Sequence, residues 1–457
     1  MLHNLEALPE YIEQLRAEFQ VPALSIAVLN DGQIHSVASG IANLTTGVSA
    51  NTETLFHIGS VTKVFTACLI MKLVERGRVE LDLPVKYYLR DFCVADSAAT
   101  ETITVRQLLC HSNGLCGDFF PDDLKQSGNP IARYLDRCNF LPQVHAPGAG
   151  FSYSNAAYAI AGRLVEVLSG ISWFEAVEEW IYKPLGMQRA VANPLDMLKF
   201  RGAMGHVPGT DNTDQWQLSP QAYFSMGLSP GGRLSMTATE LLRFAVAHLN
   251  NGQAESGEPW LGASTIAAMQ SPQVIVPSPN DAHITHWGLG WQLLQNRETP
   301  ILRHNGLTAG QSCDLWLLPE KNSAFAVQTN CNDHSVLRQV HKDMMCLLAG
   351  LSFSDPELMA TPDSVEDRAS ALYAGTYQSL AGQYEVQSTN GHWQLTIRDD
   401  IGGISTTYEL KAIVGDHSFA LYTEQGHYSG RTLSFVGHNS QGIPSGLFTG
   451  QRHILRA

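Results

Sequence analysis

Apolar and polar residues follow two different spacings along this chain. Two apolar runs, residues 23–29 and 33–40, flank Asn30-Asp31-Gly32, a combination typical of a tight β-hairpin. Residues from about 60 to 250 mostly follow helical patterns separated by long loops, and strand patterns return from about 288 to 328. The chain therefore predicts an α+β fold, in which helices flank a mainly antiparallel sheet and a helical lobe is inserted between its edges.

A change of composition separates the C-terminal part of the chain. Residues 352–370 contain two prolines, mostly acidic charges and few large apolar side chains, which predicts a linker. Beyond it, short alternating segments between Tyr373 and Val436 predict strands, with a tight turn at Asn390-Gly391. Such strands close into a small antiparallel barrel. We therefore expect a domain at 1–351, a linker at 352–370 and an all-β barrel domain at 371–457.

Composition and charge narrow the possible partners. With 457 residues, 44% hydrophobic and 16% charged, the chain can bury a large core in more than one domain. Its formal charge of −14 argues against nucleic acid and anionic membranes. No apolar run approaches the ~20 residues of a membrane helix. The N-terminal segment lacks the basic start and apolar stretch of a signal peptide, so we expect a cytoplasmic location.

The cysteines and histidines do not suggest a cofactor. The eight cysteines contain no C-x-x-C pair, and several fall in apolar runs, so we interpret them as reduced and mostly buried. The 17 histidines show no cluster with metal-ligand spacing. We expect neither a metal nor another cofactor.

The first candidate for chemistry is the tetrapeptide Ser60-Val61-Thr62-Lys63. Three residues is the helical spacing that brings a lysine amine over a serine hydroxyl, and an apolar helix pattern continues from there to Gly77. At a helix start, free backbone N–H groups also favour a developing oxyanion. The alternative is that Ser60 only caps the helix and Lys63 is solvated.

Two further segments contain polar residues that are candidates for an active site. A Gly-rich loop at 147–152 leads to Tyr153 and Asn155, which precede a helical run. Alternate positions of a non-helical segment point the same way; the alternative is that Asn155 caps the helix and Tyr153 packs beneath it. Residues 301–310 predict a strand that carries His304-Asn305-Gly306, followed by a hairpin that turns at 320–322.

Together, in this order, these three segments resemble the serine hydrolases of the penicillin-binding protein and class C β-lactamase superfamily. The resemblance covers about residues 5–350. It implies a class C β-lactamase-like fold and a covalent acyl-enzyme on Ser60. It also implies further roles, with Lys63 and Tyr153 as candidate bases, Asn155 and His304 orienting the substrate, and the backbone N–H groups of Ser60 and Leu307 forming the oxyanion hole. The predicted barrel resembles the lipocalin-like domain attached to several family peptidases, esterases and peptide-cyclising enzymes.

One departure bears on the substrate. Where β-lactamases carry Lys-Thr-Gly, this chain has His304-Asn305-Gly306, the form similar to family esterases, D-amino-acid peptidases and acyltransferases. A permanent ammonium is thereby replaced by a largely neutral imidazole. We therefore expect a hydrolase of an ester, amide or peptide bond that is not primarily a β-lactamase.

Two other functional hypotheses stay open at this stage. An acyltransferase or peptide cyclase would resolve the same acyl-enzyme with an amine, and its acyl donor could be held by a carrier protein. A non-catalytic binding or sensor module would only retain the fold. The hydrolase and the transferase both need a small-molecule or peptide substrate. The sequence leaves open the stereochemistry, the oligomeric state and the choice of base between Lys63 and Tyr153.

A competing nucleophile is Ser229, because Gly227-Leu228-Ser229-Pro230-Gly231 matches the G-x-S-x-G pattern of α/β-hydrolases. In those enzymes the residue after the serine donates its backbone N–H to the oxyanion hole, and Pro230 has no N–H. We predict a loop near the cleft instead.

Overall fold

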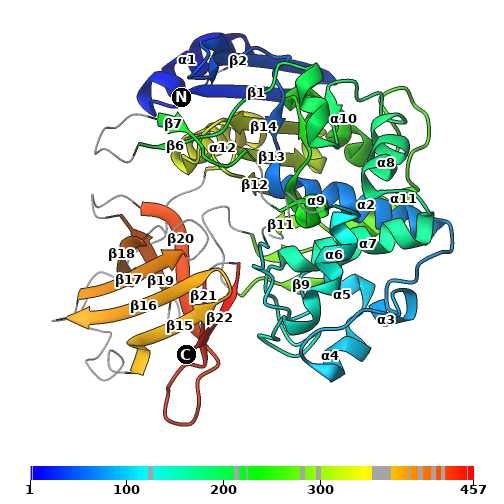
Figure 1. Cartoon of the computed structure of the whole chain (residues 1–457). Helices are drawn as coiled ribbons and strands as arrows, with labels where there is room; N and C mark the ends of the chain where they lie inside the picture. The colour runs from blue at the N-terminus through cyan, green and yellow to red at the C-terminus, as the bar shows by residue number, and fades with distance from the viewer. Residues whose placement is uncertain are drawn as a thin grey trace.

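The computed structural model describes residue 2 and residues 4–121, 127–209, 216–222, 225–277, 284–294, 300–352, 372–389, 392–399, 405–412, 418–423, 428–449 and 451–457. Within these residues, helices surround a nine-stranded sheet, and a closed barrel lies beside this body at the C-terminal end of the chain (Figure 1). The predicted α+β class and the C-terminal barrel are confirmed.

The large sheet joins strands from opposite ends of the body in the order β3-β2-β1-β14-β13-β12-β11-β10-β9. Its strands are β1 (Ala23–Asn30), β2 (Gln33–Asn43), β3 (Val48–Ser49), β9 (Val274–Ile275), β10 (His286–Trp287), β11 (Gln292–Leu294), β12 (Ile301–Leu307), β13 (Ser312–Leu318) and β14 (Ser323–Thr329). All neighbouring pairs are antiparallel. The N-terminal strands β1 to β3 therefore complete a sheet whose other strands begin only at Val274, more than 200 residues later.

Both predicted hairpins of this sheet are confirmed. Asn30 pairs with Gln33, and the two residues between them, Asp31 and Gly32, both have positive φ. That conformation matches the twist of the flanking strands, and Asp-Gly adopts it at low cost. The second hairpin turns through Asn322, which has a φ of 45°.

Twelve helices are described in the body. They are α1 (Leu8–Glu18), α2 (Thr62–Glu75), α3 (Val85–Tyr88), α4 (Ser97–Thr102), α5 (Val105–Leu109), α6 (Pro130–Asp136), α7 (Asn155–Ser169), α8 (Trp173–Val177), α9 (Ser229–Gly232), α10 (Ala238–Leu249), α11 (Ala263–Gln270) and α12 (His334–Ala349). Successive residues of β1 belong to two different parts of the core. Ile26 belongs to the buried cluster that contains residues of α1 and α12, whereas Ala27 belongs to the cluster that contains residues of α2 and α10. Helices therefore cover both faces of the sheet.

Shorter elements connect these helices and strands. They are the 3₁₀ turns Leu5–Ala7, Gly59–Val61 (η2), Cys138–Phe140, Pro194–Lys199, Met226–Leu228 and Pro319–Lys321, the π-helical turn Glu178–Tyr182, and the strands β4 (Phe56–His57), β5 (Ala190–Val191), β6 (His206–Pro208), β7 (Trp216–Leu218) and β8 (Ser235–Met236).

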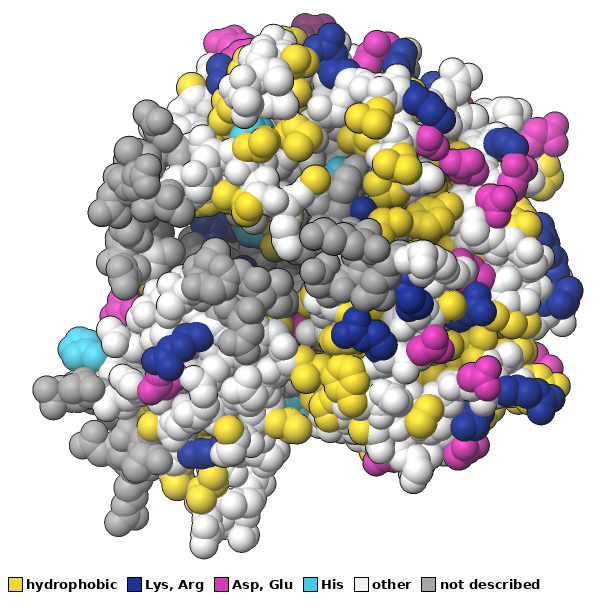
Figure 2. All heavy atoms as spheres, in the orientation of Figure 1, with side chains coloured by type: hydrophobic (Ala, Val, Ile, Leu, Met, Phe, Trp, Pro, Cys, Tyr) yellow, Lys and Arg dark blue, Asp and Glu magenta, His cyan; other side chains and the backbone are white. Residues whose placement is uncertain are grey.

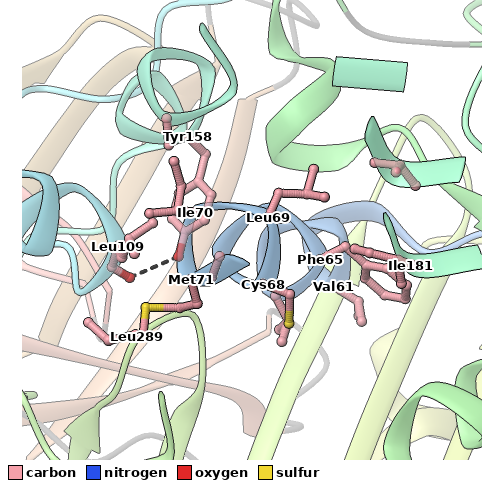
Figure 3. Close-up of a cluster of buried hydrophobic side chains, with 14 of the residues drawn as sticks. Val61, Phe65, Cys68, Leu69, Ile70, Met71, Leu109, Tyr158, Ile181 and Leu289 are labelled. Carbon is pink, nitrogen blue, oxygen red and sulfur yellow. Dashed lines mark hydrogen bonds between the residues drawn. The ribbon is translucent and has the colours of Figure 1, made fainter. Parts of the chain in front are cut away.

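Helix α2 runs through the middle of the helical lobe and is buried around nearly its whole circumference. Phe65, Leu69 and Ile70 point to different sides of α2 and are all fully buried (Figure 3). On its α7 side, the Tyr158 hydroxyl donates a hydrogen bond of 2.8 Å to the Leu109 carbonyl oxygen. A helix that is apolar all round belongs in a core, so the segment that follows Ser60 is held rigidly.

The barrel consists of eight antiparallel strands, closed by pairing of the first with the last. They are β15 (Gly375–Ser379), β16 (Gly382–Thr389), β17 (His392–Asp399), β18 (Ser405–Ala412), β19 (Ser418–Tyr422), β20 (Tyr428–Val436), β21 (Gly446–Phe448) and β22 (His453–Arg456). Tyr377, Leu395, Phe419 and Leu433 belong to its buried core. The sequence analysis did not predict β21 and β22, which are short.

Other expectations for the C-terminal part are not tested. The turn at Asn390-Gly391 and all of the linker except Ser352 lie outside the described residues. The domain boundaries at 351 and 371 and the likeness of the barrel to lipocalins stay predictions.

Two further predictions from the sequence concern the state of the cysteines and the presence of membrane-spanning helices. All eight cysteines are free thiols, and five of them, Cys68, Cys110, Cys138, Cys313 and Cys331, are buried. In the described part of the chain, no helix combines the length and the apolar character that crossing a bilayer needs.

Candidate active site

Ser60 lies on the turn between β4 and α2. The sequence predicts it at the helix start; in the structure α2 begins at Thr62, and Ser60 is the middle residue of the 3₁₀ turn η2. Gly59 has a φ of +51°, which glycine adopts with little strain. This turn leaves Ser60 in the wall of a cavity, with Lys63 in the first turn of the buried helix.

The Lys63 amine is fully buried and makes three polar contacts. Nζ lies 3.1 Å from Ser60 Oγ, 2.8 Å from Asn155 Oδ1 and 2.6 Å from the Gly231 carbonyl oxygen. The alternative of a solvated Lys63 is therefore wrong. The predicted stacking of the amine over the serine hydroxyl is confirmed.

Burial lowers the pKa of Lys63 well below its ordinary value, because the charged form loses its hydration. The positive charge of Arg452 lowers this pKa further, and the negative charge of Asp118 acts in the opposite direction. Burial therefore favours the neutral amine, which is the form that a general base requires.

Asn155 also faces Lys63 and is not the cap of its helix. The N-cap of α7 is Ser154, whose hydroxyl accepts a hydrogen bond of 3.2 Å from the Ala157 backbone N–H. The alternative interpretation of Asn155 as the N-cap is wrong. Because Ser154 performs the capping, the Asn155 side chain is available to the site.

Tyr153 packs over the same lysine and is almost fully buried. Lys63 Nζ lies 4.9 Å from the centre of the Tyr153 ring, and the phenol is hydrogen-bonded to Ser60. Burial raises the pKa of Tyr153, while the hydrogen bond with Ser60 acts in the opposite direction. The phenol is therefore neutral at physiological pH and in contact with the serine hydroxyl.

Strand β12 passes directly beside η2 and brings Leu307 to the cavity. The two segments approach closely at two glycines: a Cβ on Gly59 would lie 2.6 Å from the Leu307 nitrogen, and one on Gly306 would lie 2.8 Å from the Ser60 nitrogen. Ser60 and Leu307 both line the cavity. The two backbone N–H groups predicted for the oxyanion hole thus come from adjacent segments.

His304, on the same strand, is almost fully buried and does not line this cavity. Its Nδ1 lies 2.8 Å from the Asn305 carbonyl oxygen, and its ring packs edge-on against Trp287 at 5.6 Å. Burial lowers its pKa to about 3, so the imidazole is neutral. The sequence predicts a hydrogen bond from His304 to Tyr153 or to substrate; the structure places the ring behind the site.

Three residues that the sequence analysis did not assign to the site also lie there. His111 stacks on Tyr153 at 4.3 Å between ring centres, and its Nδ1 accepts a hydrogen bond of 3.0 Å from the Ser154 N–H. Asp118 accepts a hydrogen bond of 3.0 Å from Asn155 Nδ2, and Arg452 pairs with Asp118. Arg452 precedes β22 of the barrel, and no local signal marks it as a site residue.

The cavity at Ser60 has a volume of about 430 Å³ and lies between the body and the barrel. Figure 2 shows a hollow between these two parts, in which basic and histidine side chains are visible. The barrel contributes residues such as Tyr384, Ile397, Arg431 and Arg452 to the wall, and the body contributes Arg303 and others. The cavity is therefore a composite of both parts of the chain.

The Ser229 segment is structural. Ser229 is fully buried, and its hydroxyl donates a hydrogen bond of 2.6 Å to the Met226 carbonyl oxygen. It begins the short helix α9 near the cavity, where a loop was predicted, and the Gly231 carbonyl that follows anchors Lys63. Within the described ranges, no group of three or more His, Cys, Asp or Glu side chains is arranged to hold a metal ion.

Comparisons with known proteins identify relatives of this chain in sequence and in fold. Residues 8–344 match the family described as "Beta-lactamase". "Penicillin-binding protein 4" of Amycolatopsis lactamdurans is 35% identical over 378 residues, which cover 82% of this chain and 97% of that protein. The crystal structure of SurE is 25% identical and covers 99% of both chains with a TM-score of 0.75, and SurE is also known in a structure with D-Leu. A class C β-lactamase from Rhodobacter sphaeroides, 20% identical, shares the fold with a TM-score of 0.60 over 74% of this chain and 99% of its own.

Proposed function

The chain belongs to the beta-lactamase family of serine hydrolases, and on that premise we propose that it cleaves an ester or amide bond through an acyl-enzyme on Ser60. The observation that carries this proposal is the position of the Ser60 hydroxyl, which lies at the cavity wall and contacts both the Lys63 amine and the Tyr153 phenol. A nucleophile next to a base is the requirement for covalent acyl transfer.

We assign the base to Lys63. A neutral amine has two N–H donors and one lone pair. Asn155 Oδ1 and the Gly231 carbonyl can only accept, so they take the two N–H groups and leave the lone pair for the Ser60 hydroxyl. Burial lowers the pKa of Lys63 and raises that of Tyr153, so of this pair the amine is the group more readily present in the proton-accepting form.

Tyr153 then acts as a neutral phenol. Its hydroxyl contacts Ser60, so it can pass a proton toward the leaving group after the lysine has taken one. The developing oxyanion would lie between the backbone N–H groups of Ser60 and Leu307. Each such donor is typically worth about 3 kcal/mol of barrier.

The cavity favours an acyl donor larger than a β-lactam. Its wall continues from Ser60 to the barrel, and the position of the Lys-Thr-Gly lysine holds a buried, neutral His304. The known complex of SurE with D-Leu supports a substrate with a D-residue at the acyl donor. We therefore propose a peptide or small amide with a D-residue at the scissile bond.

The proposal is tested by mapping the acyl-enzyme. A fluorophosphonate should label the intact protein once, and peptide mass spectrometry should place the adduct on Ser60. Ser60→Ala should lose both labelling and turnover of D-aminoacyl p-nitrophenyl esters, whereas Ser229→Ala should retain them because its hydroxyl is bonded to Met226. Full activity of Ser60→Ala would refute the proposal. Stable labelling of wild type with no turnover would favour a binding or sensor role.

A second candidate is acyl transfer to an amine, including peptide cyclisation. The observation that favours it is the barrel, which forms one wall of the cavity and so adds surface on which an amine acceptor can bind next to Ser60. A peptidyl thioester analogue with a free N-terminal amine separates the two reactions by product analysis. Cyclic product supports transfer, and exclusive linear acid excludes cyclisation of that substrate. The thioester also mimics a donor held by a carrier protein.

A further inference from the structure

The barrel contacts the catalytic segment through the turn between β21 and β22. The Tyr153 backbone N–H donates a hydrogen bond of 2.8 Å to the Gln451 carbonyl oxygen. Two residues after Gln451, the His453 N–H donates a hydrogen bond of 3.3 Å to Ser152 Oγ, on the residue before Tyr153. Ser152 and Tyr153 are consecutive residues of the body. The two hydrogen bonds therefore hold the barrel turn against the segment that carries Tyr153.

Arg452 lies at the centre of this contact. Its Nη2 donates a hydrogen bond of 2.8 Å to Asp118 Oδ1, and its Nε pairs with Asp118 Oδ2. Its guanidinium also lies over the Tyr153 ring, 5.0 Å from the centre. A two-point pair with a carboxylate and a stacked ring fix a guanidinium more tightly than an ammonium could be fixed.

Asp118 passes this constraint on to the base. The Asn155 amide donates from Nδ2 to Asp118 Oδ1 at 3.0 Å and accepts through Oδ1 from Lys63 at 2.8 Å. Because an ionised carboxylate only accepts, Asp118 dictates which end of the Asn155 amide faces Lys63. If this amide flipped, its NH₂ group would face the amine and would compete for the lone pair.

We propose that Arg452, contributed by the barrel, is a positioning residue of the active site, which holds the Lys63 lone pair on Ser60 through Asp118 and Asn155. This inference rests on the proposed function. It makes the barrel a necessary half of the catalytic site, although neither Arg452 nor Asp118 reacts.

The pairing of Arg452 argues against its use as a clamp for a substrate carboxylate. Asp118 already occupies two of its nitrogens and is itself 7% exposed. The pair carries no net charge, so an anionic substrate would gain little from it.

The charges of Arg452 and Asp118 change the pKa of Lys63 in opposite directions, and the pH dependence of acylation can test this difference. Arg452 lowers the pKa of Lys63 and Asp118 raises it. The other ionisable side chains that face Lys63 are Tyr153, Tyr158, His111 and His304. Burial keeps both histidines neutral by lowering their pKa and keeps both tyrosines neutral by raising theirs, so these four groups do not add charge across the pH range of the assay.

The experiment compares Arg452→Ala, Arg452→Lys and Asp118→Asn in the full chain. Arg398→Ala is the matched control, because Arg398 is an exposed barrel arginine paired with Glu385. Single-turnover acylation of Ser60 by a D-aminoacyl p-nitrophenyl ester is followed from pH 5 to 10. Circular dichroism and the melting temperature verify that each variant is folded.

We expect Arg452→Ala to lower the acylation rate at pH 7 by about 10²-fold, the typical cost of a misplaced catalytic group. The acidic limb of its pH profile should move to higher pH, whereas that of Asp118→Asn should move to lower pH, each by about one unit. Arg452→Lys keeps the charge and loses the two-point geometry, so its limb should stay in place while its rate falls. Arg398→Ala should match wild type.

Three results would overturn the inference. The first is an acylation rate of folded Arg452→Ala equal to that of wild type. The second is an equal loss of rate in Arg452→Ala and Asp118→Asn with no opposite movement of the limb, which indicates a purely structural pair. The third is a rise in KM confined to carboxylate-bearing substrates, which indicates a substrate clamp. If wild type itself does not acylate Ser60, the proposed function fails, and that outcome is recognised before any variant is measured.

Discussion

Gly306 packs against Ile58 so closely that a Cβ at position 306 would overlap the Ile58 carbonyl oxygen. The two segments are also close at the next residue of the turn, because a Cβ on Gly59 would lie 2.6 Å from the Leu307 nitrogen and 2.9 Å from the Gly306 carbonyl carbon. The separation between β12 and η2 is therefore set by two residues without side chains. Since Ser60 and Leu307 follow these glycines directly, this contact also sets the geometry of the proposed oxyanion hole.

Gly306→Ala should therefore damage acylation as well as stability. The new methyl group has to push β12 away from η2, so we expect a loss of about 10²-fold or more in acylation, comparable to the removal of one oxyanion donor. Overpacking of this kind also typically costs about 1–3 kcal/mol of unfolding free energy. Stopped-flow acylation and urea denaturation measure the two effects. Gly150→Ala is the control, because a Cβ there meets its nearest neighbour at an ordinary 3.8 Å; a Gly306→Ala variant with wild-type acylation would contradict the proposed oxyanion hole.

Lys63→Met should abolish general-base catalysis while it largely preserves the shape of the buried side chain. We expect single-turnover acylation to fall by about 10²- to 10⁴-fold, the usual contribution of a positioned base. Lys86→Met, at a half-buried lysine that is paired with Glu101 and does not line the cavity, serves as the control. If Lys63→Met acylates at the wild-type rate, another group must deprotonate Ser60.

Tyr153→Phe should slow the reaction more than Tyr158→Phe does. Both rings lie over Lys63, but the Tyr158 hydroxyl is bonded to the Leu109 carbonyl, away from Ser60. Loss of the Tyr158 hydrogen bond should cost about 1 kcal/mol of stability and leave acylation nearly unchanged. Thermal unfolding and acylation rates, measured on both variants, distinguish a catalytic phenol from a structural one. Equal rate losses in the two variants would argue against proton transfer through Tyr153.

Buried histidines should make the fold sensitive to mild acid. Burial lowers the pKa of His57 and His248 to about 3, whereas the unfolded chain has the ordinary value of about 6.5. Below about pH 6.5 these histidines bind protons in the unfolded state but not in the folded state. Protonation should therefore lower the free energy of unfolding as the pH drops from about 6.5 toward 4, and it should have no effect above pH 7. Each histidine contributes up to about 1.4 kcal/mol per pH unit.

Urea denaturation at several pH values measures this slope, and His248→Gln should make it shallower. The His248 ring is buried against Phe244, Trp260 and Trp291, so this variant is also expected to be less stable at pH 8. The informative quantity is the slope between pH 6 and 4, not the stability at one pH. An unchanged slope would show that protonation of His248 does not contribute to acid unfolding.

Much of the local structure followed from sequence patterns, and some local details did not. The hairpin at Asp31-Gly32 and the amine-over-hydroxyl spacing of Ser60 and Lys63 need contacts only a few residues apart, and both are present. The cap of α7 was harder, because Ser154 and Asn155 are both good N-cap residues and only the geometry shows that Ser154 performs this role. The backbone of His304 was predicted correctly as strand, but its burial depends on Trp287 and on the other layers packed around it.

The sequence by itself determined the family, the nucleophile segment and the two-part α+β and all-β architecture, because periodicity, turn residues and short motifs act over a few neighbouring positions. Tertiary structure alone decided that Arg452 pairs with Asp118, 334 residues earlier, and that the barrel forms a wall of the cavity at Ser60. An ion pair between such distant residues depends on how the barrel packs against the body. No local pattern specifies which of the many charged residues will meet when those parts come together.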